Sequence, residues 1–219
     1  MNKYIFRDLK TKKEKDKLLE FFRYQANAEY GGHRLFDGTR THLMHIPEEL
    51  SNLIFFLKDY EKKKQKKFNN FLEVGFSTGK FNTILNKFFN FNSIFAIDTF
   101  SAGINSSDLL ANLVRKNLTI ICGRSDKKQN LDILKKFQPF DLIFVDGSHE
   151  YEDVKKDLST FSNMLSNKGV LMAHDIKSSE HPGVSKAWNE FKKKKNFRYK
   201  ELICKDYLIN CGVGIAIKN

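Results

Sequence analysis

The segment FLEVGFSTGK, residues 71–80, decides the fold class of this chain. Its first four residues suit a buried strand, and they lead into a turn bounded by Gly75 and Gly79. Glycine allows the backbone to turn sharply and to approach a ligand at the N-terminus of the helix that follows. The segment therefore predicts a strand–loop–helix unit whose loop contacts a ligand.

The same pattern continues toward the C-terminus. Short β-branched or aromatic runs alternate with amphipathic stretches, which is typical of βαβ units and a parallel sheet. The expected strands are 71–74, 93–97, 118–122, 141–146 and 169–173, and the expected helices are 80–89, 107–116, 130–137, 151–165 and 184–194. Gly169 is expected to be the stop signal of the helix at 151–165.

The last two apolar runs, 198–204 and 212–217, are separated by a short polar link. A parallel return needs a crossover of about a dozen residues or more, so these runs predict an antiparallel hairpin. The expected fold class is α/β: a Rossmann-like three-layer sandwich with a mostly parallel seven-stranded sheet and an antiparallel C-terminal hairpin strand.

Residues 1–62 precede this pattern and are expected to form a helical preface and a lid. Helical spacing up to residue 30 is broken at Gly31–Gly32, residues 36–39 suit a turn, and a helix is expected from Pro47 to residue 62. Gly31, Gly32 and Gly38 suit a lid that excludes water, and a plain exposed loop explains them equally well. Residues 63–219 are expected to form one compact ligand-binding domain.

Composition excludes several classes of protein. The 219 residues include 41% hydrophobic positions and 21 Phe, enough for one sizeable core, and no apolar run approaches the roughly 20 residues that span a bilayer. Three cysteines without CxxC spacing and the absence of a secretory signal favour the cytoplasm. The net charge of +12 suggests nucleic acid, but only 7 of the 38 basic residues are Arg, so a nucleic-acid partner is not expected.

Polar residues follow the predicted strands at the edge where ligands of open α/β sheets bind. Asp98 ends the second strand, 25 residues after Glu73, about where an acidic side chain binds ribose hydroxyls. The glycine loop and Asp98 together predict an adenosine-containing ligand. A dinucleotide loop is not matched, because Ser77 and Lys80 stand where its second and third glycines would be.

At these residues the chain resembles the class I S-adenosylmethionine-dependent methyltransferases. EVGFSTG, residues 73–79, looks like their first motif, with Ser77 where a glycine is often found. FDLIFVDGSHEY at 140–151 and GVLMAHD at 169–175 resemble small-molecule O-methyltransferases related to the cephalosporin-hydroxylase and antibiotic-sugar methyltransferase group. The resemblance covers about residues 40–217. Within it, residues 30–45 resemble a segment that folds over the cofactor carboxylate and the substrate mouth.

The resemblance implies that S-adenosylmethionine is the cofactor and that seven residues form its site: Glu73, Gly75, Ser77, Gly79, Asp98, Ser125 and Asp146. The glycine loop would hold the methionine moiety, Asp98 the ribose hydroxyls, and Ser125 would lie near the adenine. Relatives that use a divalent metal imply a ligand set of Asp146, His174 and Asp175, with Mg²⁺ or Mn²⁺. Since His174 is not an oxygen ligand, it would favour Mn²⁺, Fe²⁺ or Zn²⁺, and the alternatives are a buried hydrogen-bonded histidine or no metal.

The expected reaction is O-methylation of a small hydroxylated acceptor, either a sugar or a phenol-like compound. His149 lies three residues after Asp146 and is the leading general base, because a histidine can accept a hydroxyl proton near neutral pH. Asp146 is the alternative base. The alternatives to this function are methylation of RNA or another macromolecule, and a non-catalytic adenosine-binding accessory role. Relatives of this type often associate, so a homo-oligomer is a further expectation.

Overall fold

The structure, a computed structural model, describes residues 11–35, 43–101, 116–204 and 209–219. The helix expected at 107–116 falls almost wholly outside these residues, and the turn expected at 36–39, which includes Gly38 of the lid, falls wholly outside them. None of the described helices is both long and apolar enough to cross a membrane.

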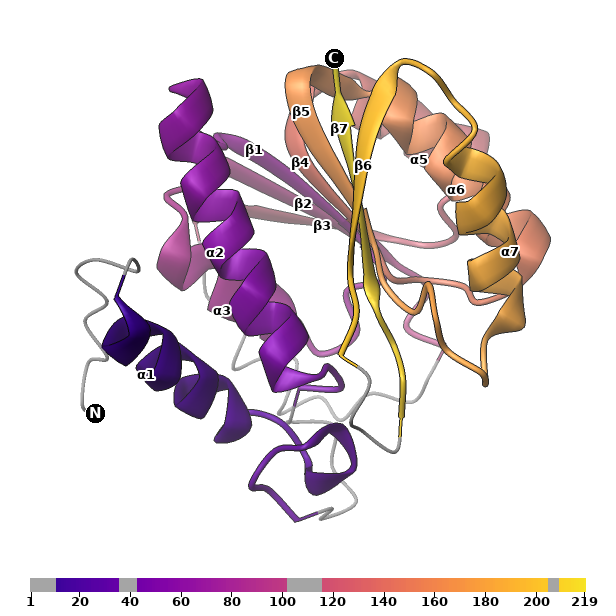
Figure 1. Cartoon of the computed structure of the whole chain (residues 1–219). Helices are drawn as coiled ribbons and strands as arrows, with labels where there is room; N and C mark the ends of the chain where they lie inside the picture. The colour runs from indigo at the N-terminus through magenta and orange to yellow at the C-terminus, as the bar shows by residue number, and fades with distance from the viewer. Residues whose placement is uncertain (1–10, 36–42, 102–115, 205–208) are drawn as a thin grey trace.

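The described strands form one seven-stranded sheet in the order β3-β2-β1-β4-β5-β7-β6 (Figure 1). The first five strands pair in parallel, and β7 pairs antiparallel with both β5 and β6. The mostly parallel sheet and the C-terminal hairpin are therefore confirmed. The strands are β1 (Asn70–Val74), β2 (Ser93–Asp98), β3 (Leu118–Cys122), β4 (Phe140–Val145), β5 (Leu165–Ala173), β6 (Phe197–Leu202) and β7 (Val213–Lys218).

Helices cover both faces of the sheet and make it the middle of three layers (Figure 1). One face is covered by α1 (Lys12–Arg23), α2 (Pro47–Lys64) and α3 (Lys80–Phe88), and the other by α5 (Lys128–Lys135), α6 (Tyr151–Asn163) and α7 (Pro182–Phe191). A short 3₁₀ helix, η1 (Ala28–Tyr30), follows α1. The boundary expected at residue 62 falls inside α2.

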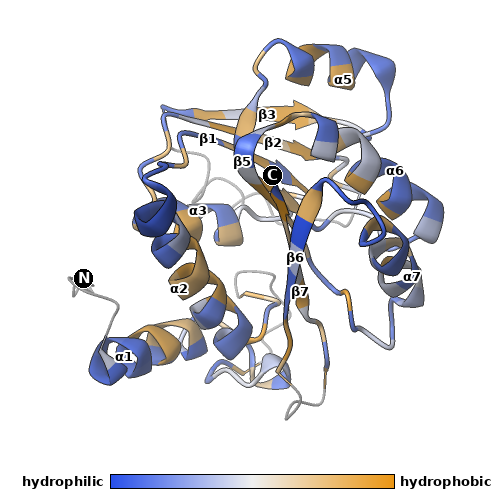
Figure 2. Cartoon of the chain, turned by 45° about the horizontal axis from the view of Figure 1, so that its top comes forward, coloured by the Kyte–Doolittle hydropathy of each residue, from blue (hydrophilic) through white to orange (hydrophobic). Residues whose placement is uncertain are grey.

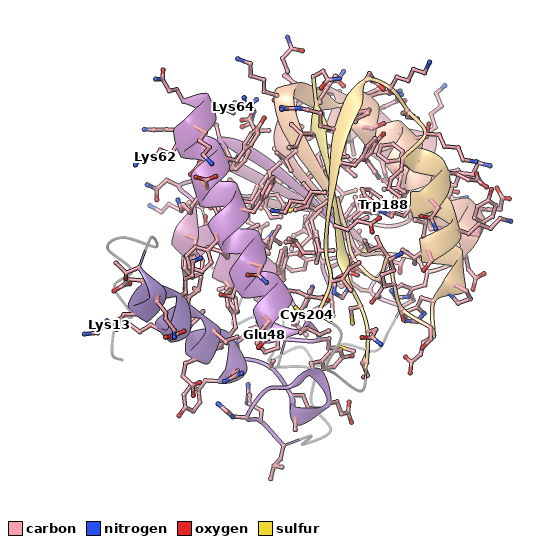
Figure 3. The ribbon with its side chains drawn as sticks, viewed as in Figure 1. Lys13, Glu48, Lys62, Lys64, Trp188 and Cys204 are labelled. Atoms are coloured by element: carbon pink, nitrogen blue, oxygen red, sulfur yellow. The ribbon has the colours of Figure 1, made fainter. Side chains whose placement is uncertain are left out.

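Alternation along the strands divides the core between the two faces. Leu142 and Phe144 pack with the side of α1–α3, whereas Ile143 and Val145 pack with the side of α6 and α7. Trp188 of α7 fills the second interface, where it is 1% exposed (Figure 3). The strands at the centre of the sheet are largely apolar, whereas the outer helices carry many hydrophilic residues (Figure 2). Because both faces are buried, the central strands need continuous apolar runs.

The role expected for Gly169 is wrong. The helix α6 ends at Asn163, and Gly169 lies inside β5. Leu165 pairs with Phe140 and Val170 pairs with Leu142, so β5 carries extra residues opposite β4. Lys168 has a φ of +57° at this irregularity. The glycine therefore serves a bulged strand rather than the end of a helix.

A buried carboxylate fixes the first turn of α2 against the C-terminal hairpin. Glu49 is 1% exposed, and its oxygens accept hydrogen bonds from the backbone N–H groups of Cys204 and Gly212, each at 3.1 Å. Figure 3 shows Cys204 beside the N-terminal end of α2. The residues just before α2 are thereby held next to the carboxyl ends of the strands.

We expect Glu49→Ala to lower the free energy of unfolding by about 2–4 kcal/mol, since two backbone donors lose their acceptor. Glu49→Gln keeps an acceptor oxygen, so it should lose less than half of that amount. Urea unfolding of both variants measures the difference. Equal unfolding midpoints for Glu49→Ala and the unchanged chain would contradict the anchoring role.

Candidate active site

A cavity of about 600 Å³ lies at the carboxyl ends of the parallel strands. All but one of the residues predicted for the site line it, namely Glu73, Ser77, Gly75, Asp98, Ser125, Asp146, His149, His174 and Asp175. The exception is Gly79, which begins α3 behind the ring of Phe76. The cavity is also lined by Tyr30, Leu43, Met44 and His45, from the segment before α2.

The loop after β1 approaches the end of β4 very closely. Gly75 has a φ of +91°, and a Cβ atom there would overlap the carbonyl oxygen of Asp146. Only glycine fits this position, since both the backbone angle and the space exclude a side chain. Ser77 also has a positive φ, +50°, which is unfavourable for serine. The loop is thus held in a strained shape directly beside Asp146.

Two acids hold this loop in place. Asp98 accepts hydrogen bonds from the backbone N–H of Ser77 at 2.7 Å and from that of Phe100 at 2.6 Å. Glu73 is buried and accepts a hydrogen bond from Asn82 Nδ2 of α3 at 2.7 Å. Each carboxylate oxygen of Asp98 has a second lone pair, so the side chain can still accept from a ligand hydroxyl.

Ser125 contacts a buried acid that the sequence analysis did not assign to the site. Its Oγ donates a hydrogen bond to Asp157 Oδ1 at 2.7 Å, and both residues line the cavity. Burial raises the pKa of Asp157 from 3.8 to about 6. Asp157 lies in α6, six residues after the 140–151 motif, and this closeness to the motif was the only signal for it in the sequence.

Two histidines and two aspartates form an inner cluster: His45, Asp146, His174 and Asp175. His174 Nδ1 lies 3.3 Å from Asp146 Oδ1 and 3.4 Å from Asp175 Oδ1. His45 Nε2 lies 3.5 Å from Asp146 Oδ2, the carboxylate oxygen that His174 does not contact. The three residues predicted as metal ligands are therefore brought together, and His45 joins them.

The charges of the inner cluster depend on one another. Burial alone would lower the pKa of His174, but the two carboxylates outweigh it and hold that pKa well above its usual value. Burial alone would raise the pKa of Asp146, and the positive charge of His174 outweighs it and lowers that pKa. For His45, burial and the charge of His174 both lower the pKa. Asp146 is therefore ionised, and His45 is neutral.

His149 and Asp175 form a second contact nearer the solvent. His149 Nε2 lies 3.1 Å from Asp175 Oδ2, and the hydrogen bond raises the pKa of His149. The ring of His149 stacks on that of His181, with centroids 3.8 Å apart and planes inclined by 8°. Asp175 has a φ of +58°, a strained conformation of the kind that clusters at functional sites.

His45 and His181 were not predicted as site residues. His45 was assigned only to the segment over the substrate mouth, yet it is 6% exposed and reaches the ends of β4 and β5. His181 precedes α7 and contacts His149 across the loop after β5. No local motif signals either residue, because both contacts join segments that are distant in the chain.

The donors could hold a divalent cation. Three groups of described residues each bring their ligand atoms within 4.8 Å of one another: His45, Asp146 and His174; His149, Asp175 and His181; and His174, Asp175 and Cys211. Three buried nitrogens have no hydrogen-bond partner among the described residues: Nδ1 and Nε2 of His45, and Nε2 of His174. Unpaired buried nitrogens beside ionised carboxylates fit a cation.

We expect Asp157→Asn to stabilise the chain at about pH 8 by about 1–3 kcal/mol and to have almost no effect near pH 4. A carboxyl group with a raised pKa is more protonated in the folded than in the unfolded chain, so its contribution to stability falls as the pH rises from about 4 to 6. Asparagine has no proton to lose, so this loss of stability disappears, and its amide oxygen can still accept the hydrogen bond from Ser125.

Unfolding at both pH values measures the effect, with Asp132→Asn on the exposed surface of α5 as the matched control. If Asp157→Asn changed the free energy of unfolding by the same amount at the two pH values, the raised pKa of Asp157 would be contradicted.

Part of the chain matches a known protein family, and the fold occurs in solved structures. Residues 72–176 match the model of a family described as a methyltransferase domain. A search of curated proteins finds no match. Solved structures share the fold, among them an O-methyltransferase from Bacillus cereus in complex with S-adenosylhomocysteine, with a TM-score of 0.60, 12% identity and coverage of 95% of this chain and 92% of that one.

Two further structures show the range of proteins with this fold. The N-methyltransferase NodS from Bradyrhizobium japonicum, in complex with S-adenosylhomocysteine, has a TM-score of 0.55 and 13% identity, and covers 94% of this chain and 97% of its own. The methyltransferase MycE of the mycinamycin biosynthetic pathway, in complex with Mg, S-adenosylhomocysteine and mycinamycin VI, has a TM-score of 0.55 and 15% identity, and covers 92% of this chain and 54% of its own.

The family match spans both the glycine loop and the polar ends of β4 and β5, where the cavity lies. The part of the chain that holds the glycine loop and these strand ends is therefore similar to a methyltransferase domain.

Proposed function

We propose that the chain methylates a hydroxyl oxygen of a small molecule and that His149 is its general base. The contact between His149 and Asp175 carries this proposal, since it holds an imidazole that lines the same cavity as the glycine loop. S-adenosylmethionine supplies an activated sulfonium methyl group, so the residues must align the acceptor and remove its proton.

The Asp175 carboxylate orients the base. A neutral His149 donates its Nε2–H to Asp175 Oδ2, which leaves Nδ1 as the nitrogen that takes the hydroxyl proton. The stacked ring of His181 fixes the plane of His149. Because the hydrogen bond raises the pKa of His149, the ring also holds a transferred proton more readily.

Asp146 is the weaker choice of base. The charge of His174 overcomes the effect of burial and lowers the pKa of Asp146, and a carboxylate with a lowered pKa accepts protons poorly. Its position between the glycine loop and the inner cluster suits binding rather than proton transfer. We assign Asp146 a role in binding both the cofactor and a cation.

The proposed cofactor residues divide by their contacts. Gly75 and Ser77 would face the methionine moiety, and Gly79 serves the turn into α3. Asp98 would bind the ribose hydroxyls, and Ser125 would lie near the adenine. Glu73 supports the loop through Asn82 rather than touching the ligand.

A divalent cation held by Asp146, His174 and Asp175 would polarise the acceptor oxygen and make its proton easier to remove. The unpaired buried nitrogens of the inner cluster support such a cation. The Mg in the MycE complex gives further support, since that protein shares the fold.

Several observations favour a small acceptor over RNA. The cavity of about 600 Å³ suits a drug-sized molecule. The lysines at the end of α2, including Lys62 and Lys64, lie at the opposite end of that helix from Glu48 (Figure 3). Since α2 has 18 residues, this basic end lies roughly 25 Å from the turn that borders the cavity.

The proposed activity is tested by incubating the chain and S-adenosylmethionine with a phenol, a catechol, a nucleotide sugar and a mixed-sequence RNA. Formation of S-adenosylhomocysteine is measured with Mg²⁺, Mn²⁺ or Zn²⁺ and with a chelator. We expect product with at least one small hydroxylated acceptor and a methyl ether in its mass spectrum. Methylation of RNA alone, or of a nitrogen atom alone, would overturn the proposal.

We expect His149→Gln to lower kcat by about 10²- to 10⁴-fold, because the acceptor proton loses its base. The Kd for S-adenosylhomocysteine, measured by calorimetry, should change little. His33→Gln is the matched control, since His33 pairs with Glu20 at 2.9 Å on the surface near α1. If both variants keep full kcat, His149 is not the base.

A further inference from the structure

His45 is the residue of the cavity that the proposed reaction leaves unexplained. Its ring stacks on Phe81, with centroids 5.1 Å apart and planes inclined by 15°. Its centroid lies 4.3 Å from that of His174 and 6.0 Å from that of Phe144. The imidazole is thus surrounded by aromatic rings and by the Asp146 carboxylate.

A buried imidazole in such surroundings needs a polar partner. Neither ring nitrogen of His45 has a hydrogen-bond partner within the described part of the chain. The distance of 3.5 Å from Nε2 to Asp146 Oδ2 is longer than an ordinary hydrogen bond. Burying an unpaired polar group costs free energy, so a phenylalanine or leucine would be more stable there unless the nitrogen binds something.

We propose that His45 is a metal ligand and that it joins Asp146 and His174 in a site for a transition-metal dication such as Zn²⁺, Fe²⁺ or Mn²⁺. This inference deepens the proposed function, since it names the ligands and the kind of metal beside the acceptor. It adds to the predicted set a nitrogen donor from outside the matched residues 72–176.

The distances between donors suit such an ion. One ligand atom from each of His45, Asp146 and His174 lies within 4.8 Å of the others, and His45 and His174 lie 3.5 and 3.3 Å from the two oxygens of Asp146. Donors bound at about 2.1 Å around one ion are roughly 3.0–3.4 Å apart, depending on whether the geometry is octahedral or tetrahedral. The two contacts to the Asp146 oxygens are close to these values, and the two imidazole donors, which lie within 4.8 Å of each other, would move together on binding.

The donor types select the metal. Two imidazoles and one carboxylate suit Zn²⁺, Fe²⁺, Co²⁺ or Mn²⁺, whereas Mg²⁺ prefers oxygen ligands. Asp175 adds a second carboxylate 3.4 Å from His174 Nδ1, as a further ligand. With His45 bound, the segment before α2 would be tied to the strand ends, and Glu49 already holds the first turn of that helix.

The other two donor groups fit less well. His149 and His181 are partly exposed, so water can satisfy their nitrogens, and their rings are stacked face to face. Burial raises the pKa of the Cys211 thiol strongly, and the Asp175 charge adds to this, which disfavours the thiolate that a metal binds.

The test is metal binding to the metal-stripped chain, measured by calorimetry with Zn²⁺, Mn²⁺ and Mg²⁺ and by the visible absorption of Co²⁺. We expect Zn²⁺ and Co²⁺ to bind much more tightly than Mg²⁺, and His45→Asn to weaken Zn²⁺ binding by about 100-fold or more. With Cu²⁺ as the probe, the nitrogen superhyperfine pattern should report two nitrogen ligands in the unchanged chain and one in His45→Asn.

His181→Asn is the matched control and should keep the affinity for Zn²⁺ and both nitrogen ligands. Equal binding of Zn²⁺ by His45→Asn and the unchanged chain, or loss of binding only in His181→Asn, would overturn the inference. Binding of S-adenosylhomocysteine, measured on the same samples, separates the two proposals. If the nucleoside binds and the metal does not, the metal site fails alone. If the metal binds and no acceptor is methylated, the proposed reaction fails alone.

Discussion

Two carboxylates, the half-buried Asp146 and the buried Asp175, meet at the ends of adjacent parallel strands, and the rest of the site depends on the positive charge between them. Asp146 follows β4 and Asp175 follows β5, and His174 Nδ1 lies 3.3 and 3.4 Å from their oxygens. Two like charges this close would destabilise the fold if nothing compensated them. Because β4 and β5 pair in parallel and bring these acids together, the fold requires a compensating positive charge. A protonated His174 or a metal cation would supply it.

The same two acids contact parts of the molecule that are distant in sequence. Asp175 also orients His149, and Asp146 carries the backbone carbonyl against which Gly75 packs. The N-terminal helices contribute as well, because Glu49 fixes the start of α2 and so places His45 on the Asp146 carboxylate. The base, the glycine loop and the N-terminal segment thus converge on one pair of acids.

Much of the fold could be predicted because strand periodicity and loop length are local signals. The runs at 93–97 and 118–122 match β2 and β3 closely, and the short link before 212–217 predicted the antiparallel pairing of β6 and β7. Gly169 was misassigned because a bulge in β5 depends on its pairing with β4, which the residue itself does not reveal. The strand ends likewise revealed Asp146 and Asp175, since topology brings them together.

The residues that were missed depend on tertiary contacts. His45 precedes Pro47 in a segment with no motif, and only the packing of α2 on the sheet brings it to the strand ends. The stacking of His181 on His149 depends on how the loop after β5 folds back. Such contacts leave no periodic trace in the sequence.

A crystal structure with S-adenosylhomocysteine and Zn²⁺ would show most directly whether this cavity holds the cofactor. We expect the ribose hydroxyls to lie on Asp98, the sulfur to face the His149 side of the cavity, and the anomalous scattering from zinc to lie between His45, Asp146 and His174. A nucleoside bound elsewhere, with the glycine loop facing solvent, would contradict the central claim that this cavity is where the methyl group is transferred.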